Sequence, residues 1–400
     1  MRGLLSGLTL GLVSMAVWAG DWPQFRGPGG SGVSSDSHLP IRWSSTENIA
    51  WKANLPGRGL SSPVVAKGRV FLTACSAFQQ TRLHVLCFDL KDGKLLWERQ
   101  FWATGNTMCH PKTNMAAPTP VTDGQRVFAL FATCDLVCLD VDGNLVWYRS
   151  LTSDYPTVTN QVGMAASPVL HQDTLVLLLE NAGESFAAGI DAHTGQNRWK
   201  IERKRRINWN TPLLFTKNGQ TSVIFQTPDE LAAFDPRTGE KRWSYAASEL
   251  ATIPSPAAGD GMLLVPGKEL LLLRPGDSAA PELVWQSARL RPATASPTIY
   301  KNRVYVLTGA GVLNCADAQS GKVLWQERLK GPFSASPLIA GDRLYAVSED
   351  GVTSVVQLGD EPKVLSVNPI GETILASPVP ADGKLLLRSD EHLFCIGAGK

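Results

Sequence analysis

Short apolar stretches alternate with polar turn segments along almost the whole chain. Residues 69–73 and 303–307 are typical, because they are rich in β-branched and aromatic side chains and are bounded by Gly, Asp or Asn. Side chains of these types pack well on the pleated surface of a sheet. The pattern therefore predicts an all-β protein built from many short strands.

A small residue followed by proline marks the start of each structural unit. Eight pairs of this kind recur in step along the chain; the last six of their prolines are separated by 40 to 44 residues, whereas the first two intervals, of 55 and 50 residues, indicate insertions. Proline is tolerated at the first residue of a strand, so each pair is predicted to begin one. The pairs are Ser62-Pro63, Ala117-Pro118, Ser167-Pro168, Thr211-Pro212, Ser255-Pro256, Ser296-Pro297, Ser336-Pro337 and Ser377-Pro378.

A second marker recurs in phase with the first and consists of an acidic residue, a glycine and a tryptophan. The glycine indicates a tight turn with positive φ, and the strand after the turn carries the tryptophan. Together the markers define units of about 40 residues with four short strands, which is the signature of a propeller blade. The marker occurs at Asp89…Gly93…Trp97, Asp140…Gly143…Trp147, Asp191…Gly195…Trp199, Asp235…Gly239…Trp243 and Asp317…Gly321…Trp325, and Trp285 has the same phase.

Eight unit starts predict an eight-bladed β-propeller of four-stranded blades. The last unit contains only three strands, whereas residues 48–52 form a fourth-strand pattern ahead of the first unit. We expect this N-terminal strand to complete the last blade, because that closure would remove an exposed sheet edge. The predicted organisation is a signal peptide at 1–19, an extended segment at 20–45 and the propeller at 46–400.

A tryptophan in the outermost strand of seven of the eight predicted blades is expected to have a structural role; the seventh blade lacks one. A large flat side chain at the same position in each unit can pack between neighbouring blades and bury about 150–250 Å². These tryptophans are Trp51, Trp97, Trp147, Trp199, Trp243, Trp285 and Trp325. Four of the seven cysteines occupy one phase of the repeat and are predicted to be small buried strand residues, namely Cys87, Cys138, Cys315 and Cys395.

The first residues predict export from the cytoplasm. Met1 and Arg2 precede an apolar run without charge, and small residues around position 19 indicate cleavage after Ala19. The run of about 16 residues is short for a membrane span, which needs about 20; retention as an uncleaved anchor is the alternative. We expect a periplasmic or secreted protein.

Charge argues against some classes of partner. Charged residues make up 18% of the 400 residues, and the formal net charge is +2. So small a net charge gives no field that would attract nucleic acid or an anionic membrane. Residues 203–206, which read Arg-Lys-Arg-Arg, are the one strongly basic cluster, and such clusters are most often solvated loops.

The turn sequence before the tryptophans has a familiar form. Asp-x-x-Thr-Gly-x-x-x-Trp, at residues 191–199 and 235–243, resembles the repeat of pyrroloquinoline-quinone (PQQ) dehydrogenases and of BamB-like propellers, over about residues 46–400. Residues 21–28 and 110–124 are also similar to exported bacterial propellers of the PQQ-binding-like or BamB-like type. The resemblance implies the propeller fold and export, and it raises the question of a cofactor.

The residues that would hold PQQ are not recognisable in the sequence. The dehydrogenases hold PQQ between a tryptophan and a disulfide of adjacent cysteines, and bind calcium through Glu, Asn and Asp. This chain has no Cys-Cys pair and no clear carboxylate cluster for a cation that takes about six to eight oxygen ligands. We therefore expect no cofactor and no metal, and assign no catalytic residue. A PQQ- and calcium-dependent alcohol or sugar dehydrogenase is the alternative.

Three cysteines lie outside the repeat phase. Cys75 and Cys134 are expected at second-to-third-strand hairpins, and Cys109 in the long connection between the first two blades, so all three emerge on one face. Disulfides persist in exported proteins, and Cys109 is predicted to pair with Cys134 or Cys75 if the Cα atoms lie about 4.4–6.8 Å apart. A zinc site formed with His110 is an alternative that no ligand spacing supports.

The same face carries the longest insertions and is the candidate binding face. Loops on a rigid scaffold commonly carry function, aromatic side chains are enriched at interfaces, and arginines can bind carboxylates in a fork geometry. The candidate residues are Phe101, Trp102, His110, Lys112, Tyr155, Arg203, Arg205, Arg206 and Trp209. We predict a monomeric, non-catalytic scaffold that binds an envelope or secreted protein, or a glycan.

Overall fold

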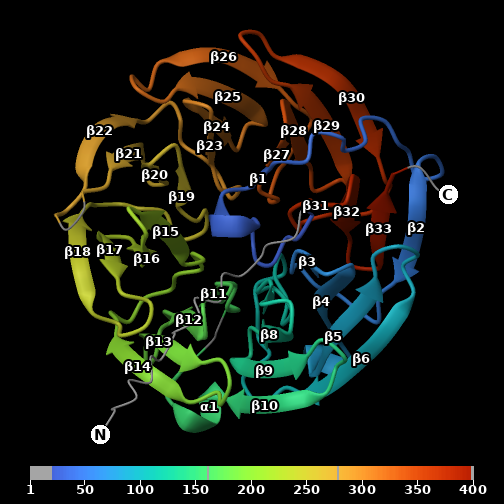
Figure 1. Cartoon of the computed structure of the whole chain (residues 1–400), viewed down its shortest axis with the longest axis vertical. Helices are drawn as coiled ribbons and strands as arrows, with labels where there is room; N and C mark the ends of the chain where they lie inside the picture. The colour runs from blue at the N-terminus through green and yellow to red at the C-terminus, as the bar shows by residue number, and fades with distance from the viewer. Residues whose placement is uncertain (1–19, 160–161, 277–278, 398–400) are drawn as a thin grey trace, which may run out of the picture.

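The computed structural model describes residues 20–159, 162–276 and 279–397, and the predicted signal peptide at 1–19 lies outside them. The described strands form eight sheets arranged as blades around a common axis (Figure 1). Helix is almost absent and is limited to α1 (Leu151–Asp154) and the 3₁₀ turns η1 (Pro28–Gly30) and η2 (Phe78–Gln80) in this part of the chain. The predicted eight-bladed all-β propeller is confirmed.

Each blade is an antiparallel sheet whose strands run in chain order from the axis outwards. Blade 1 consists of β3 (Val64–Ala66), β4 (Arg69–Ser76), β5 (Arg82–Asp89) and β6 (Leu95–Trp102), and blade 2 consists of β7 (Val121–Thr122), β8 (Arg126–Leu130), β9 (Asp135–Asp140) and β10 (Leu145–Ser150). Blade 3 consists of β11 (Val169–His171), β12 (Thr174–Leu179), β13 (Phe186–Asp191) and β14 (Asn197–Glu202). Blade 4 consists of β15 (Leu213–Lys217), β16 (Gln220–Thr227), β17 (Glu230–Phe234) and β18 (Lys241–Ala246).

Blades 5 to 7 follow the same order. Blade 5 consists of β19 (Ala257–Gly259), β20 (Met262–Val265), β21 (Leu270–Arg274) and β22 (Glu282–Ser287). Blade 6 consists of β23 (Thr298–Tyr300), β24 (Arg303–Leu307), β25 (Val312–Asp317) and β26 (Val323–Arg328). Blade 7 consists of β27 (Leu338–Ala340), β28 (Arg343–Val347), β29 (Val352–Gln357) and β30 (Lys363–Pro369). Blade 7 also gains β1 (Val33–Ser34), which pairs in parallel with β27 on the axial side.

Blade 8 combines strands from both ends of the chain. Its three inner strands are β31 (Val379–Ala381), β32 (Lys384–Arg388) and β33 (His392–Ile396), and the outermost strand is β2 (Ile49–Asn54). β2 pairs antiparallel with β33, and Trp51 lies opposite Cys395. Figure 1 shows β2 beside β33 at the outer edge of the ring.

The core lies between neighbouring blades rather than within one layer. The second and third strands of a blade are buried on both faces, as in β12, whereas an outer strand such as β14 alternates between exposed and covered positions. A strand covered on both faces is apolar throughout, and one covered on a single face alternates with period two. This difference explains the two hydrophobic patterns within each repeat.

The blade tryptophans join each blade to the next. In six of the described blades the indole Nε1–H donates to a backbone carbonyl in the last turn of the following blade, at 2.9–3.0 Å. For all of these except Trp325, the turn glycine of the following blade packs against the indole ring, and a Cβ added at Gly93 would lie 2.5 Å from the ring of Trp51. The six donors are Trp51, Trp97, Trp147, Trp199, Trp285 and Trp325.

A closed ring of hydrogen bonds, which we call the hydroxyl ring, joins the starts of the eight inner strands. In each blade a serine or threonine hydroxyl accepts the backbone N–H of the equivalent residue in the preceding blade, at 2.9–3.2 Å, and the bond from Ser377 N–H to Ser62 Oγ closes the cycle. In blade 2 this residue is Thr119, which precedes Pro120. The prediction that Ala117-Pro118 begins that blade is therefore wrong by two residues, because alanine has no hydroxyl to accept the bond.

The segment before β2, residues 20–45, crosses the axis of the ring, and we call it the axial segment. Trp22 forms two backbone hydrogen bonds with Val65 of blade 1, and Gly32 accepts the N–H of Ile339 in blade 7. The 3₁₀ turn η1 and β1 lie at the centre of the ring in Figure 1. From there the chain runs outwards past blade 7, where Tyr345 Oη donates to the Leu39 carbonyl. The sequence predicts only extended chain for 20–45 and not this axial position.

Candidate functional site

The propeller has two unlike faces. We call the one that bears the connections between blades and the second-to-third-strand hairpins the loop face, and the opposite one the turn face. The longest connections, between blades 1 and 2 and between blades 2 and 3, both lie on the loop face. The predicted binding residues also lie on or near this face, so it is the first candidate site.

Three connections on the loop face pack together. The backbone N–H of His110 donates to the Val162 carbonyl at 3.2 Å, and the indole of Trp209 donates to the Gly163 carbonyl at 2.6 Å. The backbone N–H of Trp209 also donates to Thr252 of the next connection. The structure therefore brings His110 and Trp209 together in one assembly of loops, in which Trp209 has a structural partner.

Lys112 connects two distant blades. Its ammonium group lies 3.0 Å from Glu349, which belongs to the β28–β29 hairpin of blade 7, whereas Lys112 itself follows blade 1. Burial alone raises the pKa of Glu349, but hydrogen bonds from Ser334 and Lys112 outweigh it and bring that pKa below the ordinary value. The long connection between blades 1 and 2 is thereby fixed at both ends, and Lys112 is engaged within the chain.

Two of the predicted aromatic residues have structural contacts: Phe101 joins blade 1 to blade 2, and Tyr155 attaches the connection after blade 2 to blade 3. The ring of Phe101 stacks on Tyr148 with 5.9 Å between centroids, and the ring of Tyr155 lies 4.7 Å from Phe186. The Lys200 ammonium group also lies over Tyr155, 4.3 Å from its centroid. Phe101 and Tyr155 are both partly buried, so most of their surface is used in packing.

The basic cluster is largely neutralised by acidic side chains. Arg203 donates to Glu180 at 2.9 Å in an almost buried ion pair, and Arg206 donates to Asp229 at 2.8 Å. The hydrogen bonds from Arg206 and then Lys204 hold the pKa of Asp229 well below its usual range. The expectation that Arg203 and Arg206 offer free forks to a carboxylate is wrong for these two residues, because internal carboxylates occupy them. Arg205 is exposed.

Three strongly exposed apolar side chains on the loop face belong to blade 1 and to the connection that follows it. Trp102 is 60% exposed, Met108 62% and Phe78 81%. The Arg82 guanidinium lies over the Trp102 ring at 3.7 Å, which is within the range of a cation–π contact. We call Phe78, Arg82, Trp102 and Met108 the blade 1 rim.

Phe78 and Arg82 are members of the rim that the sequence prediction missed. Phe78 lies in the β4–β5 hairpin, where Ala77, Gln79 and Gln80 all have φ between 54° and 65°. Such conformations are costly for residues other than glycine and are concentrated at functional sites. An apolar residue at the tip of a short hairpin is the sequence signal that could have indicated it.

The cysteines do not form the predicted disulfide. All seven lie within the described residues and are free thiols. The Gln80 amide lies between Cys75 and Cys109, with Oε1 3.2 Å from Cys75 Sγ and Nε2 3.6 Å from Cys109 Sγ. Cys134 is completely buried, and burial raises the pKa of its thiol to about 12. The long connection is held by hydrogen bonds instead.

A serine, a histidine and a glutamate form a relay on blade 1. Ser76 Oγ lies 2.7 Å from His84 Nε2, and His84 Nδ1 lies 2.6 Å from Glu98 Oε1. This order is that of a nucleophile, a base and an orienting carboxylate. However, the backbone at Gly57 covers Ser76, since a Cβ there would lie 2.9 Å from Ser76 Cβ. The relay therefore satisfies the polar groups of a buried histidine.

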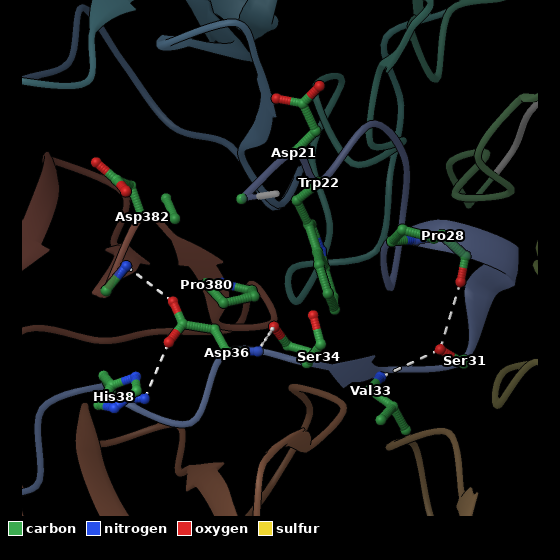
Figure 2. Close-up of a pocket in the computed structure, with 14 residues that line it drawn as sticks. Asp21, Trp22, Pro28, Ser31, Val33, Ser34, Asp36, His38, Pro380 and Asp382 are labelled. Atoms are coloured by element: carbon green, nitrogen blue, oxygen red, sulfur yellow. Dashed lines mark hydrogen bonds between the residues drawn. The ribbon is translucent and has the colours of Figure 1, made fainter. Parts of the chain in front are cut away.

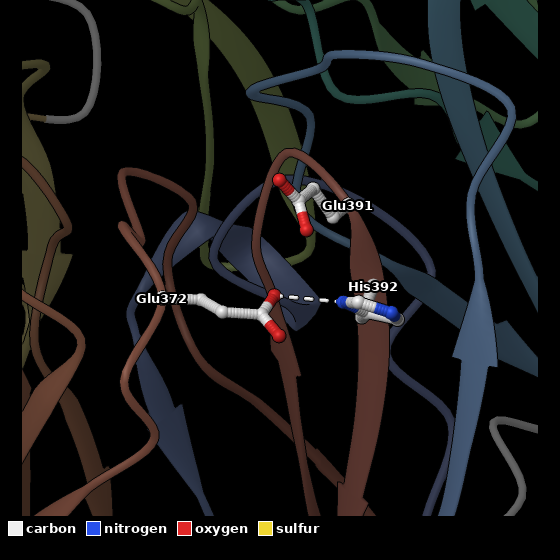
Figure 3. Close-up of side chains that lie close together, drawn as sticks. All are labelled: Glu372, Glu391 and His392. Atoms are coloured by element: carbon white, nitrogen blue, oxygen red, sulfur yellow. Dashed lines mark hydrogen bonds and ion pairs between the residues drawn. The ribbon is translucent and has the colours of Figure 1, made fainter.

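Glu372, Glu391 and His392 are the only group of three potential metal ligands found in the described residues (Figure 3). Glu372 Oε2 accepts from His392 Nδ1 at 2.9 Å and from Ser389 Oγ at 2.6 Å, and its other oxygen lies 3.0 Å from the Lys52 ammonium group. Glu372 thus already has a cationic partner and two donors. This group carries no metal site.

A broad hollow lies on the turn face, where the axial segment enters the ring (Figure 2). It has a volume of about 840 Å³ and is lined by residues 20–38 and by the first turn of blade 8. Asp36 accepts backbone N–H groups from His38 at 2.9 Å and Gly383 at 2.8 Å. The oxygens of Asp36 are therefore used to attach the segment to blade 8.

The fold and the repeated turn, hydroxyl and tryptophan define a propeller of PQQ-like repeats. A family model described as outer membrane protein assembly factor BamB matches residues 31–245, 183–273 and 276–360. The chain belongs to that family.

The similar proteins include BamB itself and quinoprotein enzymes. BamB of Legionella pneumophila (strain Paris) is 24% identical over 202 residues, and the match spans half of each chain. The crystal structure of BamB from Moraxella catarrhalis has a TM-score of 0.65 at 14% identity, over 87% of this chain and 96% of that one. A europium-containing methanol dehydrogenase has a TM-score of 0.69 at 13% identity, over 92% and 89%. At these identities the structural likeness establishes the fold alone.

The residues of this chain do not fit a PQQ and calcium site of the kind described for the dehydrogenases. No two cysteines are adjacent in the sequence. The only described group of three potential ligands lies in blade 8, and a lysine and two hydrogen-bond donors already occupy Glu372 there. We derive no chemical step through this cofactor.

Proposed function

We propose that the protein is an exported, non-catalytic scaffold that binds another envelope or secreted protein through the blade 1 rim. The observation that carries the proposal is the exposure of Phe78 and Trp102 on blade 1 and of Met108 in the connection after it, with Arg82 stacked on Trp102. Aromatic residues, methionine and arginine are enriched at protein interfaces, and exposed apolar side chains that lie together mark binding surfaces. A periplasmic or secreted location follows from the predicted cleavage after Ala19.

Family membership supports a scaffold role, because BamB is described as an assembly factor. No helix among the described residues is long and apolar enough to cross a bilayer. A protein partner is preferred to a glycan because the rim is dominated by apolar side chains and its one arginine is stacked on Trp102. We propose that the protein acts as a monomer, with the rim free for the partner.

Crosslinking in cells tests the proposal. A photoreactive residue at position 78 should capture a specific envelope or secreted protein, and the additional change Trp102→Ala should reduce the capture at least tenfold. The control is Leu145→Ser, because Leu145 is similarly exposed, at 56%, but lies at the outer edge on the turn face. Equal capture in all variants, or none in the parent, would overturn the assignment of the blade 1 rim.

A PQQ-dependent dehydrogenase is the second candidate, favoured by the fold of the methanol dehydrogenase and of quinohemoprotein alcohol dehydrogenase from Comamonas testosteroni. The purified protein should be titrated with PQQ and Ca²⁺. Because the described residues provide no matching ligand set, we expect no saturable change in cofactor absorbance and no dye-linked oxidation of alcohols or sugars. Saturable cofactor uptake together with turnover would show that the protein is a dehydrogenase and would overturn the scaffold proposal.

A further inference from the structure

Arg26 carries a buried charge at the axis of the ring. The side chain is 3% exposed and comes from the axial segment, where Arg26 itself adopts φ 59°. The Gly32 N–H donates to the Arg26 carbonyl and closes a tight loop around the guanidinium. A Cβ at Gly32 would lie only 2.8 Å from Nη2. The loop therefore directs the guanidinium into the ring and leaves it no alternative position.

Only one of the three guanidinium nitrogens has partners. Nη2 donates to the Pro297 carbonyl at 2.7 Å, to Thr298 Oγ1 at 2.9 Å and to the Ser31 carbonyl at 3.1 Å. Nε and Nη1 are buried and have no hydrogen-bond partner among the described residues. A buried donor without an acceptor destabilises the folded chain, and more so if the group is charged.

A small cavity of about 10 Å³ adjoins the guanidinium. Ser62, Ser336 and Ser377 of the hydroxyl ring also line it. Each of these hydroxyls accepts a backbone N–H from the preceding blade, which leaves its own proton available to donate. The cavity thus combines a cationic group having unused N–H donors with neutral O–H donors, and this is the chemistry of an anion site.

No acidic side chain among residues 20–159, 162–276 and 279–397 pairs with Arg26. Burial lowers the pKa of its guanidinium to about 9, and no acidic neighbour opposes that shift, so the group is still cationic at neutral pH. Arg388 is equally buried but differs, because its donors reach Ser61 and the Thr73 and Ser389 carbonyls, and Asp390 acts in the opposite direction on its pKa. A buried ion without a partner is strongly destabilising.

We infer that the axial cavity binds a single small anion of halide size, held by Arg26 Nε and Nη1 and by the hydroxyls of Ser336 and Ser377. The volume corresponds to about one water molecule, so a carboxylate or phosphate ligand is too large. Chloride is the physiological ion of this class. It would join the axial segment to the blades around it and stabilise the closed ring.

Bromide provides the direct test. Crystals grown with bromide in place of chloride should give an anomalous peak in the cavity beside Arg26, with nearly full occupancy. An ordered water there, or no bromide peak, overturns the proposal. This measurement uses the unchanged protein and does not depend on whether any variant folds.

Thermal unfolding provides the second test. At constant ionic strength, raising chloride a hundredfold against gluconate should raise Tm by about 3 °C if the ion binds only the folded chain. Arg26→Gln should abolish this difference, whereas Arg42→Gln, which changes an exposed arginine of the same segment, should preserve it. Equal Tm in chloride and gluconate for the unchanged protein, or an undiminished difference in Arg26→Gln, contradicts the site.

Discussion

At the residue scale, a turn glycine can be required for two separate reasons, and blade 1 allows them to be distinguished. Gly68 and Gly93 both have φ 74°, a conformation that L-residues rarely adopt. A Cβ at Gly68 would meet no atom within 4 Å, whereas one at Gly93 would lie 2.5 Å from the Trp51 ring. Backbone strain is therefore common to both positions, and only Gly93 is also limited by packing.

We predict that Gly93→Ala destabilises the protein clearly more than Gly68→Ala. The change at Gly68 should cost about 1 kcal/mol from backbone strain alone. The change at Gly93 should cost about 2–4 kcal/mol because the added methyl group displaces the indole and its hydrogen bond to the Leu90 carbonyl. Urea unfolding of both variants measures the difference; equal losses would mean that the tryptophan contact contributes nothing.

A second residue-scale prediction concerns acid stability in blade 3. Arg198 lies 2.7 Å from both Asp173 and Asp191. Burial alone raises the pKa of Asp191, but hydrogen bonds from Arg198, Thr194 and His193 outweigh it and bring that pKa to about 2. The hydrogen bond from Arg198 also lowers the pKa of Asp173.

Because these pKa values are depressed in the folded state, their stabilisation is complete above about pH 4 and is lost as the pH falls towards 2. Arg198→Met should therefore cost about 1 kcal/mol at pH 6, a modest figure because the pair is partly exposed. The difference in the free energy of unfolding between Arg198→Met and the parent should be smaller at pH 3. Urea midpoints at both pH values provide the measurement, with Arg42→Met as control; a difference that does not change with pH would contradict the assignment.

At the element scale, β2 has a role that no loop has. It supplies the outermost strand of blade 8, and Trp51 extends from it to blade 1. Deleting residues 46–53 should therefore lower Tm by more than 10 °C, far more than deleting residues 103–110, which lie outside the sheets. Thermal unfolding and limited proteolysis would show the difference. If the strand deletion melted like the loop deletion, the pairing with β33 would not hold the ring together.

The element scale also shows what sequence can predict. Units of about 40 residues are visible because each blade repeats the same turn, hydroxyl and tryptophan. The error at Ala117 arose where two small-residue–proline pairs occur in succession, and a requirement for a hydroxyl would have chosen Thr119. The axial position of residues 20–45 has no local signature, because its partners, such as Val65, Ile339 and Gly383, are distant in sequence and recognise mainly backbone.

The candidate site was less predictable than the fold for a related reason. Residue types indicated Arg203 and Arg206 as donors, but only the folded chain places Glu180 and Asp229 beside them. The disulfide prediction was wrong for the same reason, because chain position does not reveal that Gln80 lies between Cys75 and Cys109. Exposure, which defines the blade 1 rim, is also a property of the folded molecule.

At the scale of the whole molecule, the hydroxyl ring makes closure a shared property of eight blades. Ser296→Ala would leave the buried N–H of Ser255 without its acceptor and should cost about 1–3 kcal/mol. Ser296→Thr should cost much less, because Thr119 and Thr211 already occupy equivalent positions in blades 2 and 4. Denaturant unfolding separates the two variants; an equal loss would show that size, and not the hydroxyl, matters there.

The pairing of β2 with β33 has a consequence for biosynthesis. Residues 49–54 are synthesised before blades 1 to 7, and their partner at residues 392–396 is synthesised after those blades. During synthesis or passage through a translocation pore, blades 1 to 7 can form in order, whereas this early strand has no partner until the final strand emerges. Such a nascent chain keeps an unpaired edge that is open to wrong pairing. Truncation within the last few residues should therefore make the protein as prone to aggregation and proteolysis as the loss of a whole blade.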